Sequence, residues 1–329
     1  MKKIDVFSHI FTKDYSKKFM ALVPEVSKTI EFERPAMVDL AVRERSMSRF
    51  PDVLQIVTMG NVPPERYVSA KDAIELATIG NEEMAELVVT RPNLFCGAVG
   101  VIPVEDVDAS MKVIDHCICD LGLLGIQLYT TLERESFAEP KYRPIFALMA
   151  ELDRPIWVHP SGTITPPGSN EVSRRRGMFS QPFESSAPDR GMFSWPYEST
   201  RFMLDVVTAG IFAEFPKLKI IIHHAGGMVP HYRERIRTIM PKHEEDYFTY
   251  FYTDTALYGN TPGLMSAYDF FGAEHILFGT DSPLGSPLAG SNGSTDRTIM
   301  AIEKMDIPDE DKEKIFHGNA MKILSPLLL

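Results

Sequence analysis

Short apolar segments alternate along the chain with longer stretches in which apolar residues recur at helical spacing. The apolar segments are 4–9, 53–60, 94–103, 123–130, 155–160, 218–224, 250–257 and 275–281. Between them, residues 71–92 and 143–155 carry apolar side chains along one face of a helix. Buried strands that alternate with helices indicate βαβ units and hence a parallel sheet.

Eight such strands in a chain of 329 residues favour a closed (β/α)8 barrel, the TIM barrel, over an open doubly wound sheet. An open sheet of that type is expected to carry a phosphate-binding fingerprint, and neither GxGxxG nor GxxxxGK[ST] occurs in the sequence. We therefore predict an α/β protein with a single barrel domain over residues 1–329.

One segment departs from this alternation. Residues 161–200 are rich in Pro, Gly, Ser and Arg, and the stretch 177–190 is followed by the similar stretch 191–204. Connections between elements are usually only about 2–6 residues long in α/β units. We therefore predict a long loop insertion, partly duplicated, after the fifth strand.

Charge and composition exclude several classes of protein. The formal net charge of −11 argues against nucleic acid as a partner, although a local cluster of arginines could still bind an anionic small molecule. No apolar run reaches the length of a membrane span, and the chain begins without the pattern of a signal peptide. The three cysteines form no CxxC pair. Together these features predict a cytoplasmic protein.

Metal-ligand residue types stand at the ends of four predicted strands. His9 ends the first strand, His159 the fifth, His223 and His224 the sixth, and Asp281 the eighth. Any one of them alone could be a hydrogen-bonded structural group, or a helix cap in the case of Asp281. Because the carboxyl ends of the strands meet at one mouth of a barrel, the combination predicts a site for a divalent metal.

The first strand decides which side chains can join that site. Strict alternation places Asp5, Phe7 and His9 on one face of this strand, and Val6 and Ser8 on the other. Phe7 should then point into the barrel mouth beside His9. Asp254, at the end of the seventh strand, is interpreted as a residue that orients a metal ligand, with a helix cap as the alternative.

Several motifs together resemble those of a known family. The motifs are "HHAGGMVPHYRERI" (223–236), "DTALYGN" (254–260), "ILFGTD" (276–281) and "HGNAMKIL" (317–324). They resemble the amidohydrolase superfamily, in particular the branch that contains aminocarboxymuconate semialdehyde decarboxylase and γ-resorcylate decarboxylase. The resemblance implies that His9, His159 and Asp281 are metal ligands and that His224 is the strand-six histidine beside the metal. His223, one place earlier, is interpreted as a packing residue.

Phe7 is the departure from the family pattern, because it occupies the position of the first ligand in a His-x-His motif. A phenylalanine cannot bind a metal. His9, His159 and Asp281 still provide the three protein ligands of a typical catalytic zinc site, and His224 could act as a fourth ligand or as a base. We therefore expect a divalent metal, zinc with manganese as the alternative, bound more weakly than by the complete motif.

The resemblance also implies a function. We expect non-oxidative decarboxylation of a small aromatic or conjugated carboxylic acid, with Asp281 and His224 as the catalytic groups that handle the proton. Arg235 matches a family arginine that in some members reaches a neighbouring subunit's site, and Arg43 is a weaker match to an arginine that binds the substrate carboxylate. Phe7 would line the substrate pocket.

The same residues allow two alternative functions and predict an oligomeric state. A hydrolase or hydratase could use the same metal site, and the loss of a ligand at Phe7 would also suit a catalytically silent barrel that only binds a ligand. The match of Arg235 to a residue that acts across a subunit boundary predicts a homodimer or higher homo-oligomer.

Overall fold

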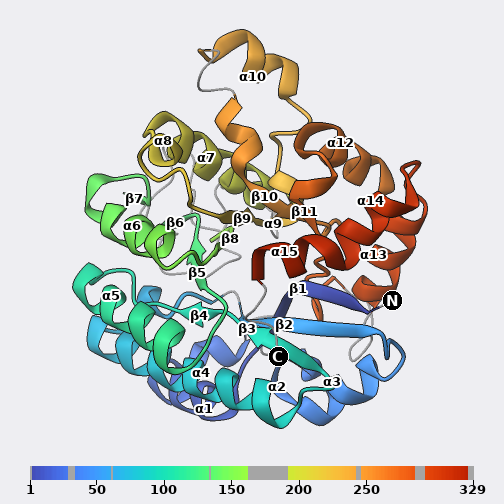
Figure 1. Ribbon diagram of the computed structural model, residues 1–329. Helices are drawn as coiled ribbons and strands as arrows, with labels where there is room; N and C mark the ends of the chain where they lie inside the picture. The colour runs from blue at the N-terminus through green and yellow to red at the C-terminus, as the bar shows by residue number, and fades with distance from the viewer. Residues whose placement is uncertain are drawn as a thin grey trace, which may run out of the picture.

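The computed structural model describes residues 2–28, 34–60, 62–132, 135–161, 192–241, 246–285 and 293–324. Within these residues, strands occupy the interior and helices surround them, as Figure 1 shows. Most of the predicted insertion at 161–200, including the first copy of its repeat, lies outside the described residues.

Each predicted apolar segment contains a strand. The parallel strands are β1 (Lys3–Ile10), β2 (Val53–Met59), β3 (Phe95–Ala98), β4 (Gly100–Val101), β5 (Ile126–Tyr129), β8 (Ile156–His159), β9 (Ile220–Ile222), β10 (Tyr252–Asp254) and β11 (Ile276–Leu277). They pair in the orders β1-β2-β3 and β4-β5-β8-β9-β10-β11. A short antiparallel pair, β6 (Thr131–Leu132) and β7 (Glu135–Ser136), lies between β5 and the next helix.

Backbone hydrogen bonds join the two groups of strands into a ring. Val99, between β3 and β4, donates from its backbone to Val57 of β2 at 2.9 Å. On the other side, β1 pairs with the segment that follows β11, where His9 N donates to Ser282 O at 2.7 Å and Asp281 N donates to Phe7 O at 2.9 Å. The described strands therefore form the (β/α)8 barrel that the sequence predicted.

Helices connect the strands, and most of them form the outer layer of the barrel. They are α1 (Lys13–Leu22), α2 (Pro35–Val38), α3 (Leu40–Met47), α4 (Ala70–Thr90), α5 (Val107–Asp115), α6 (Arg143–Glu151), α7 (Ser194–Thr208), α8 (Ile211–Glu214), α9 (His223–Gly226), α10 (Arg233–Ile239), α12 (Thr261–Phe271), α13 (Gly293–Glu303), α14 (Asp309–Glu313) and α15 (Asn319–Leu324). None of the described helices combines the length and apolar character that crossing a lipid bilayer demands. The helices predicted over 71–92 and 143–155 correspond to α4 and α6.

Apolar side chains on the two faces of the strands form two separate cores. The outer core lies between the strands and the helices. The inner core fills the barrel with residues from several strands, among them Ile4, Ile56, Trp157, Ile221 and Leu277, together with residues of α15. Trp157 is completely buried and donates its indole N–H to the backbone oxygen of Val6 at 3.0 Å. This packed interior supports the strand ends that carry the polar residues.

A β-bulge in β1 changes which side chains face inward. Asp5 pairs with Gln55 and Ser8 pairs with Val57, so that three steps along β1 match two steps along β2. Because a bulge inserts one extra residue, the alternation expected for this strand is interrupted. Phe7 packs in the inner core as expected, but Val6 packs there too and Asp5 contacts Gln55 and Thr280, which corrects the prediction from strict alternation.

Asp5 belongs instead to a buried polar network. Its carboxylate accepts hydrogen bonds from Thr280 Oγ1 at 2.6 Å and from Gln55 Nε2 at 3.2 Å. Burial raises the pKa of Asp5 to about 7, although these hydrogen bonds act in the opposite direction. The network joins β1 to β2 and to the segment after β11, and thus supports the same closure of the barrel.

Arg43 extends this network from α3. It is only 1% exposed, donates from Nε to Gln55 Oε1 at 3.0 Å, and donates from a terminal nitrogen to the backbone oxygen of His9. Its guanidinium lies 5.5 Å from the ring centre of Phe95, which belongs to the outer core. Arg43 thus contacts the strands from the outer layer, and its Nη2 is buried without a hydrogen-bond partner among the described residues. Its contact with a substrate carboxylate stays a prediction.

We predict that Arg43→Leu lowers the free energy of unfolding by about 3 kcal/mol, because it leaves buried acceptors on Gln55 and His9 without a donor. Urea denaturation measures this change. Arg45→Leu, at an exposed position of the same helix, is the matched control and should have little effect. Unchanged stability in Arg43→Leu, together with weaker substrate binding, would place Arg43 in the substrate site.

Candidate metal centre

The ends of β1 and β8 and the segment after β11 bring His9, His159 and Asp281 together. One nitrogen or oxygen atom from each residue lies within 4.8 Å of the corresponding atoms of the other two. His9 Nε2 lies 3.0 Å from Asp281 Oδ1, and all three side chains are fully buried. Two imidazoles and a carboxylate at this spacing could hold a divalent metal ion.

The far atoms of these residues are fixed by neighbouring groups. His159 Nδ1 lies 2.7 Å from the backbone oxygen of Pro160, and His9 Nδ1 lies 2.9 Å from Thr58 Oγ1. The hydroxyl of Tyr258 donates to Asp281 Oδ2. Partners of this kind orient metal ligands in proteins. The sequence reasoning missed Thr58 and Tyr258, although Tyr258 stands in the motif "DTALYGN".

An unpartnered nitrogen of His159 indicates that this cluster of residues suits a metal. His159 Nε2 is buried and has no hydrogen-bond partner among the described residues. Buried polar atoms without a partner are rare, because each one costs about 1–3 kcal/mol. A cation bound between His159, His9 and Asp281 would satisfy this nitrogen, and we conclude that the residues fit a divalent metal.

The protonation states also suit metal binding. Burial lowers the pKa of His159 well below its ordinary value, and the nearby His224 and His9 lower it further. Burial would raise the pKa of Asp281, but the interactions with His9, His224 and Tyr258 outweigh it and hold the pKa below its ordinary value. Tyr258 stays protonated, since burial and Asp281 raise its pKa well above 10. The neutral imidazole of His159 and the ionised carboxylate of Asp281 are the forms that bind metals.

His224 lies in a strained turn directly after β9. His224 and Ala225 have φ values of 60° and 54°, in the left-handed region where non-glycine residues cost roughly 1–3 kcal/mol each. Asp254 holds this turn, because its Oδ1 accepts from the backbone N–H of His224 at 3.0 Å and of Ala256 at 2.9 Å. His224 Nε2 is buried without a partner among the described residues.

His223 and Phe7 form a stacked pair inside the barrel. Their ring centres are 3.5 Å apart and their planes differ by 17°. His223 Nδ1 lies 2.6 Å from Asp254 Oδ2, so this histidine does more than fill space. The ring of Phe7 also lies 4.6 Å from that of His9 and 5.6 Å from that of His159. Phe7 therefore lies among the histidines, but His223 covers one of the faces on which a substrate could have stacked.

Aromatic side chains line the outer part of this site. The Trp195 ring of α7 lies 5.6 Å from the His159 ring and runs nearly parallel to the His224 ring at 6.1 Å. Its indole nitrogen is buried without a partner in the described part of the chain. Tyr129, at the end of β5, lies 6.4 Å from the His159 ring. These rings were not predicted as site residues, because their approach depends on how the strand ends and α7 are placed.

Glu198 of α7 fixes the turn that follows His159. Its Oε2 accepts from the backbone N–H of Ser161 at 2.7 Å and from Thr130 Oγ1 at 2.8 Å. Arg66 donates to the backbone oxygen of Ser161 at 2.6 Å. Glu198 is fully buried, so these bonds anchor α7 to the ends of β5 and β8 close to the histidines.

Arg235 is not brought to the cluster within this chain. It is exposed on α10, a helix at the top of Figure 1 that has no buried residue and packs against the outer core through the partly buried Ile236. Its expected role across a subunit boundary therefore depends on a second copy of the chain.

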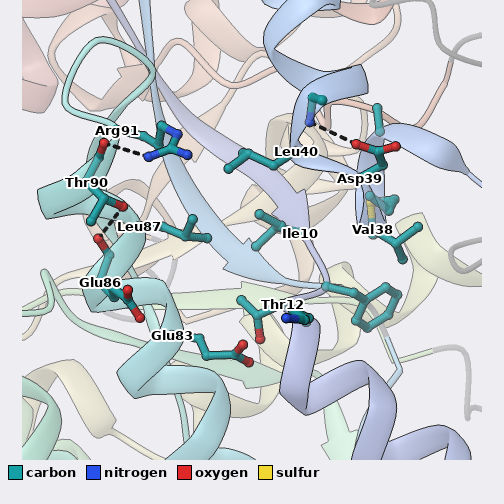
Figure 2. A pocket seen from close by; sticks show the side chains of 15 residues that line it. Ile10, Thr12, Val38, Asp39, Leu40, Glu83, Glu86, Leu87, Thr90 and Arg91 are labelled. Carbon is teal, nitrogen blue, oxygen red and sulfur yellow. Dashed lines mark hydrogen bonds between the residues drawn. The ribbon is translucent and has the colours of Figure 1, made fainter.

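A pocket of about 630 Å³ lies elsewhere, between the start of α1, the α2–α3 region and α4 (Figure 2). Ile10, Leu40 and Leu87 form part of its apolar lining. Two of its charged groups have structural partners: Glu83 accepts from the backbone N–H groups of Asp14 and Tyr15 in α1, and Arg91 pairs with Glu44. The pocket is separate from the strand-end cluster and brings no comparable set of buried ligand atoms together.

Solved structures support the fold. A dihydroxybenzoic acid decarboxylase from Polaromonas, solved with bound manganese and the inhibitor 2-nitroresorcinol, matches with a TM-score of 0.78 at 22% identity. The match covers 98% of this chain and 96% of that chain.

Curated relatives have similar lengths. The 6-methylsalicylic acid decarboxylase of Penicillium expansum is 27% identical, over 78% of this chain and 76% of the relative. The 2-keto-4-carboxy-3-hexenedioate hydratase of a Sphingobium species is 26% identical, over 78% of this chain and 73% of the relative.

The family model described as amidohydrolase matches residues 41–325, which is most of the sequence. The chain therefore belongs to the amidohydrolase family.

Proposed function

We propose that this protein is a metal-dependent decarboxylase that removes carbon dioxide, without oxidation, from a small aromatic carboxylic acid. The buried group of His9, His159 and Asp281 carries the proposal, because it fits a divalent metal at the mouth of the barrel. Relatives named as decarboxylases of 6-methylsalicylic acid and of γ-resorcylate, at 27% and 26% identity, support the reaction type.

His9, His159 and Asp281 would hold the metal, with His224 as a fourth ligand or as a base. We propose zinc, with manganese as the alternative, since the solved relatives include structures with bound manganese. The bound ion would polarise the carboxylate and a neighbouring oxygen of the substrate and offset the negative charge that develops. The chain itself supplies the orientation of these ligands, through Thr58 and Tyr258.

Decarboxylation replaces carbon dioxide by a proton, so the site needs a group that delivers one. We assign this role to His224, because its Nε2 is buried, has no partner among the described residues, and belongs to a ring 5.4 Å from that of His159. Asp281 would assist by keeping its negative charge near His224, since its two oxygens are engaged by His9 and Tyr258. The strained turn that Asp254 stabilises would keep His224 in place during the transfer.

Trp195 and Tyr129 would form the walls against which a planar acid packs. Their rings lie close to the His159 ring and would exclude water from the reacting carbon. Phe7 is fully buried and would lie beneath such a substrate, while His223 occupies one face of its ring.

A hydratase is the second candidate. The relative from Sphingobium is named as a hydratase and is nearly as similar as the decarboxylases. The same metal ligands and the same proton carrier would serve addition of water to a conjugated acid. The two reactions differ in their products, since one releases carbon dioxide and the other consumes water.

The experiment that tests the function measures carbon dioxide release from 6-methylsalicylate and 2,6-dihydroxybenzoate by protein loaded with zinc or manganese. We expect release with deuterium at the vacated carbon when the solvent is D2O. Asp281→Ala should lose activity by at least about a hundredfold, since general acid–base groups contribute 10²–10⁴-fold, and should also lose metal. Asp269→Ala, at the exposed end of an ion pair, is the control. Addition of water without carbon dioxide release would favour the hydratase.

We predict that Phe7→His tightens metal binding by about tenfold or more, because it restores a ligand beside His9. Competition with a chromogenic chelator measures the affinity. Phe7→Leu removes the ring without adding a ligand and is the matched control. Equal affinity of wild type and Phe7→His would mean that residue 7 does not stand at the ligand position.

We infer that the protein is a homodimer and that α10 belongs to the interface. No residue of α10 is buried, and Ile239 and Tyr232 are 66% and 43% exposed. Ile239→Glu should shift sedimentation toward the monomer, because it places a charge on an apolar contact, whereas Thr238→Glu on the same helix should shift it less. An active wild-type monomer at working concentration would contradict the inference.

The proposal includes a cytoplasmic location. Cys96, Cys117 and Cys119 are all free thiols, two of them buried, as expected for a protein in a reducing compartment.

A further inference from the structure

We propose that Tyr258 is a positioning residue of the metal centre, which makes Asp281 a ligand through one oxygen only. The inference rests on the metal site of the proposed function and adds a residue to it. Tyr258 does not face the ion. It would act by holding one carboxylate oxygen of Asp281 so that the other is the oxygen offered to the metal.

The two oxygens of Asp281 have different surroundings. Oδ1 faces the cluster, 3.0 Å from His9 Nε2. Oδ2 accepts a hydrogen bond from the Tyr258 hydroxyl. Asp281 is fully buried, so solvent does not compete for either oxygen. The carboxylate is therefore held in one rotational state, with a single oxygen toward His9 and His159.

The backbone at both ends of this contact is unusual. Tyr258 and Asp281 have φ values of 52° and 58°, in a region that non-glycine residues seldom occupy. Tyr258 lies in the turn after β10, and Asp281 lies in the segment after β11, so the contact links two neighbouring strand ends. Such strain persists where the surrounding structure fixes it, and it clusters at functional sites.

Gly285 provides the space that the Tyr258 ring needs. A Cβ atom at position 285 would lie 2.0 Å from Cε1 and 2.3 Å from Cδ1 of this ring, and Gly285 itself has a φ of 68°. Only glycine meets both conditions at no steric cost. The loop that follows Asp281 thus contains the glycine that leaves room for Tyr258, the residue that holds Asp281.

Binding through one oxygen has a chemical consequence. A catalytic metal keeps at least one position open for water or substrate, in addition to its protein ligands. If Asp281 could rotate, both of its oxygens could bind, and the second would compete with the substrate for that position. The Tyr258 hydroxyl prevents this rotation by occupying Oδ2.

The test compares wild type with Tyr258→Phe after loading with cobalt(II), whose visible absorption reports coordination number. We expect Tyr258→Phe to bind metal about 10- to 100-fold more weakly, as is usual when the partner of a ligand is lost. We also expect its absorption in the visible range to weaken, because binding of the second oxygen raises the coordination number. Competition with a chelator gives the affinity, and neither readout requires turnover.

Tyr268→Phe is the matched control. Tyr268 also donates its hydroxyl to an aspartate, at 2.6 Å from Asp311 Oδ2, but on α12 at the outside of the barrel. It should leave both affinity and spectrum unchanged. Gly285→Ala is a second variant, which moves the Tyr258 ring without removing its hydroxyl, and should weaken metal binding in the same direction.

Two different results would contradict these assignments, one for Tyr258 alone and one for the whole metal centre. Metal affinity within twofold of wild type in Tyr258→Phe, with an unchanged cobalt spectrum, would remove Tyr258 from the site and leave the proposed function intact. A wild-type protein that binds no cobalt, zinc or manganese would overturn the metal centre and the proposed function together.

Discussion

The pairing of β1 with the segment after β11 is the interaction on which the site depends. Asp281 N donates to Phe7 O and His9 N donates to Ser282 O, so the first and last strands of the barrel are neighbours. This pairing alone brings His9 to within 3.0 Å of Asp281, although 271 residues separate them in the sequence. Closure of the barrel and assembly of the metal ligands are thus one event, and the buried network of Asp5 with Thr280 strengthens it from the outer face.

The order of strands and helices could be predicted because each element has its own local pattern, and the ligand types stood visibly at strand ends. His9, His159 and Asp281 were found in this way. Tyr258 and Trp195 could not be, because an aromatic residue in a loop or at a helix start has the same local pattern whether it packs or contacts a ligand. Their roles depend on left-handed turns and on the docking of α7, which no short stretch of sequence encodes.

Phe7 and His223 pack against each other at the centre of the histidine cluster. The phenylalanine fills the volume of an imidazole, and the additional histidine of strand six stacks on it at 3.5 Å. His223 is in turn tied to Asp254, which also holds the backbone of His224. Phe7 is therefore connected to His224, the residue proposed to carry the proton, through three successive contacts that do not involve the metal.

The bulge in β1 allows one strand to supply side chains both to the outer polar network and to the site inside the barrel. Asp5 contacts the outer network of Gln55 and Thr280, whereas Phe7 and His9 lie among the site residues inside the barrel. In a regular strand these positions would share a face, and a change that suited one layer would disturb the other. The extra residue places these two sets of side chains on different faces of a strand of eight residues. A substitution in the outer network therefore need not disturb the site inside the barrel.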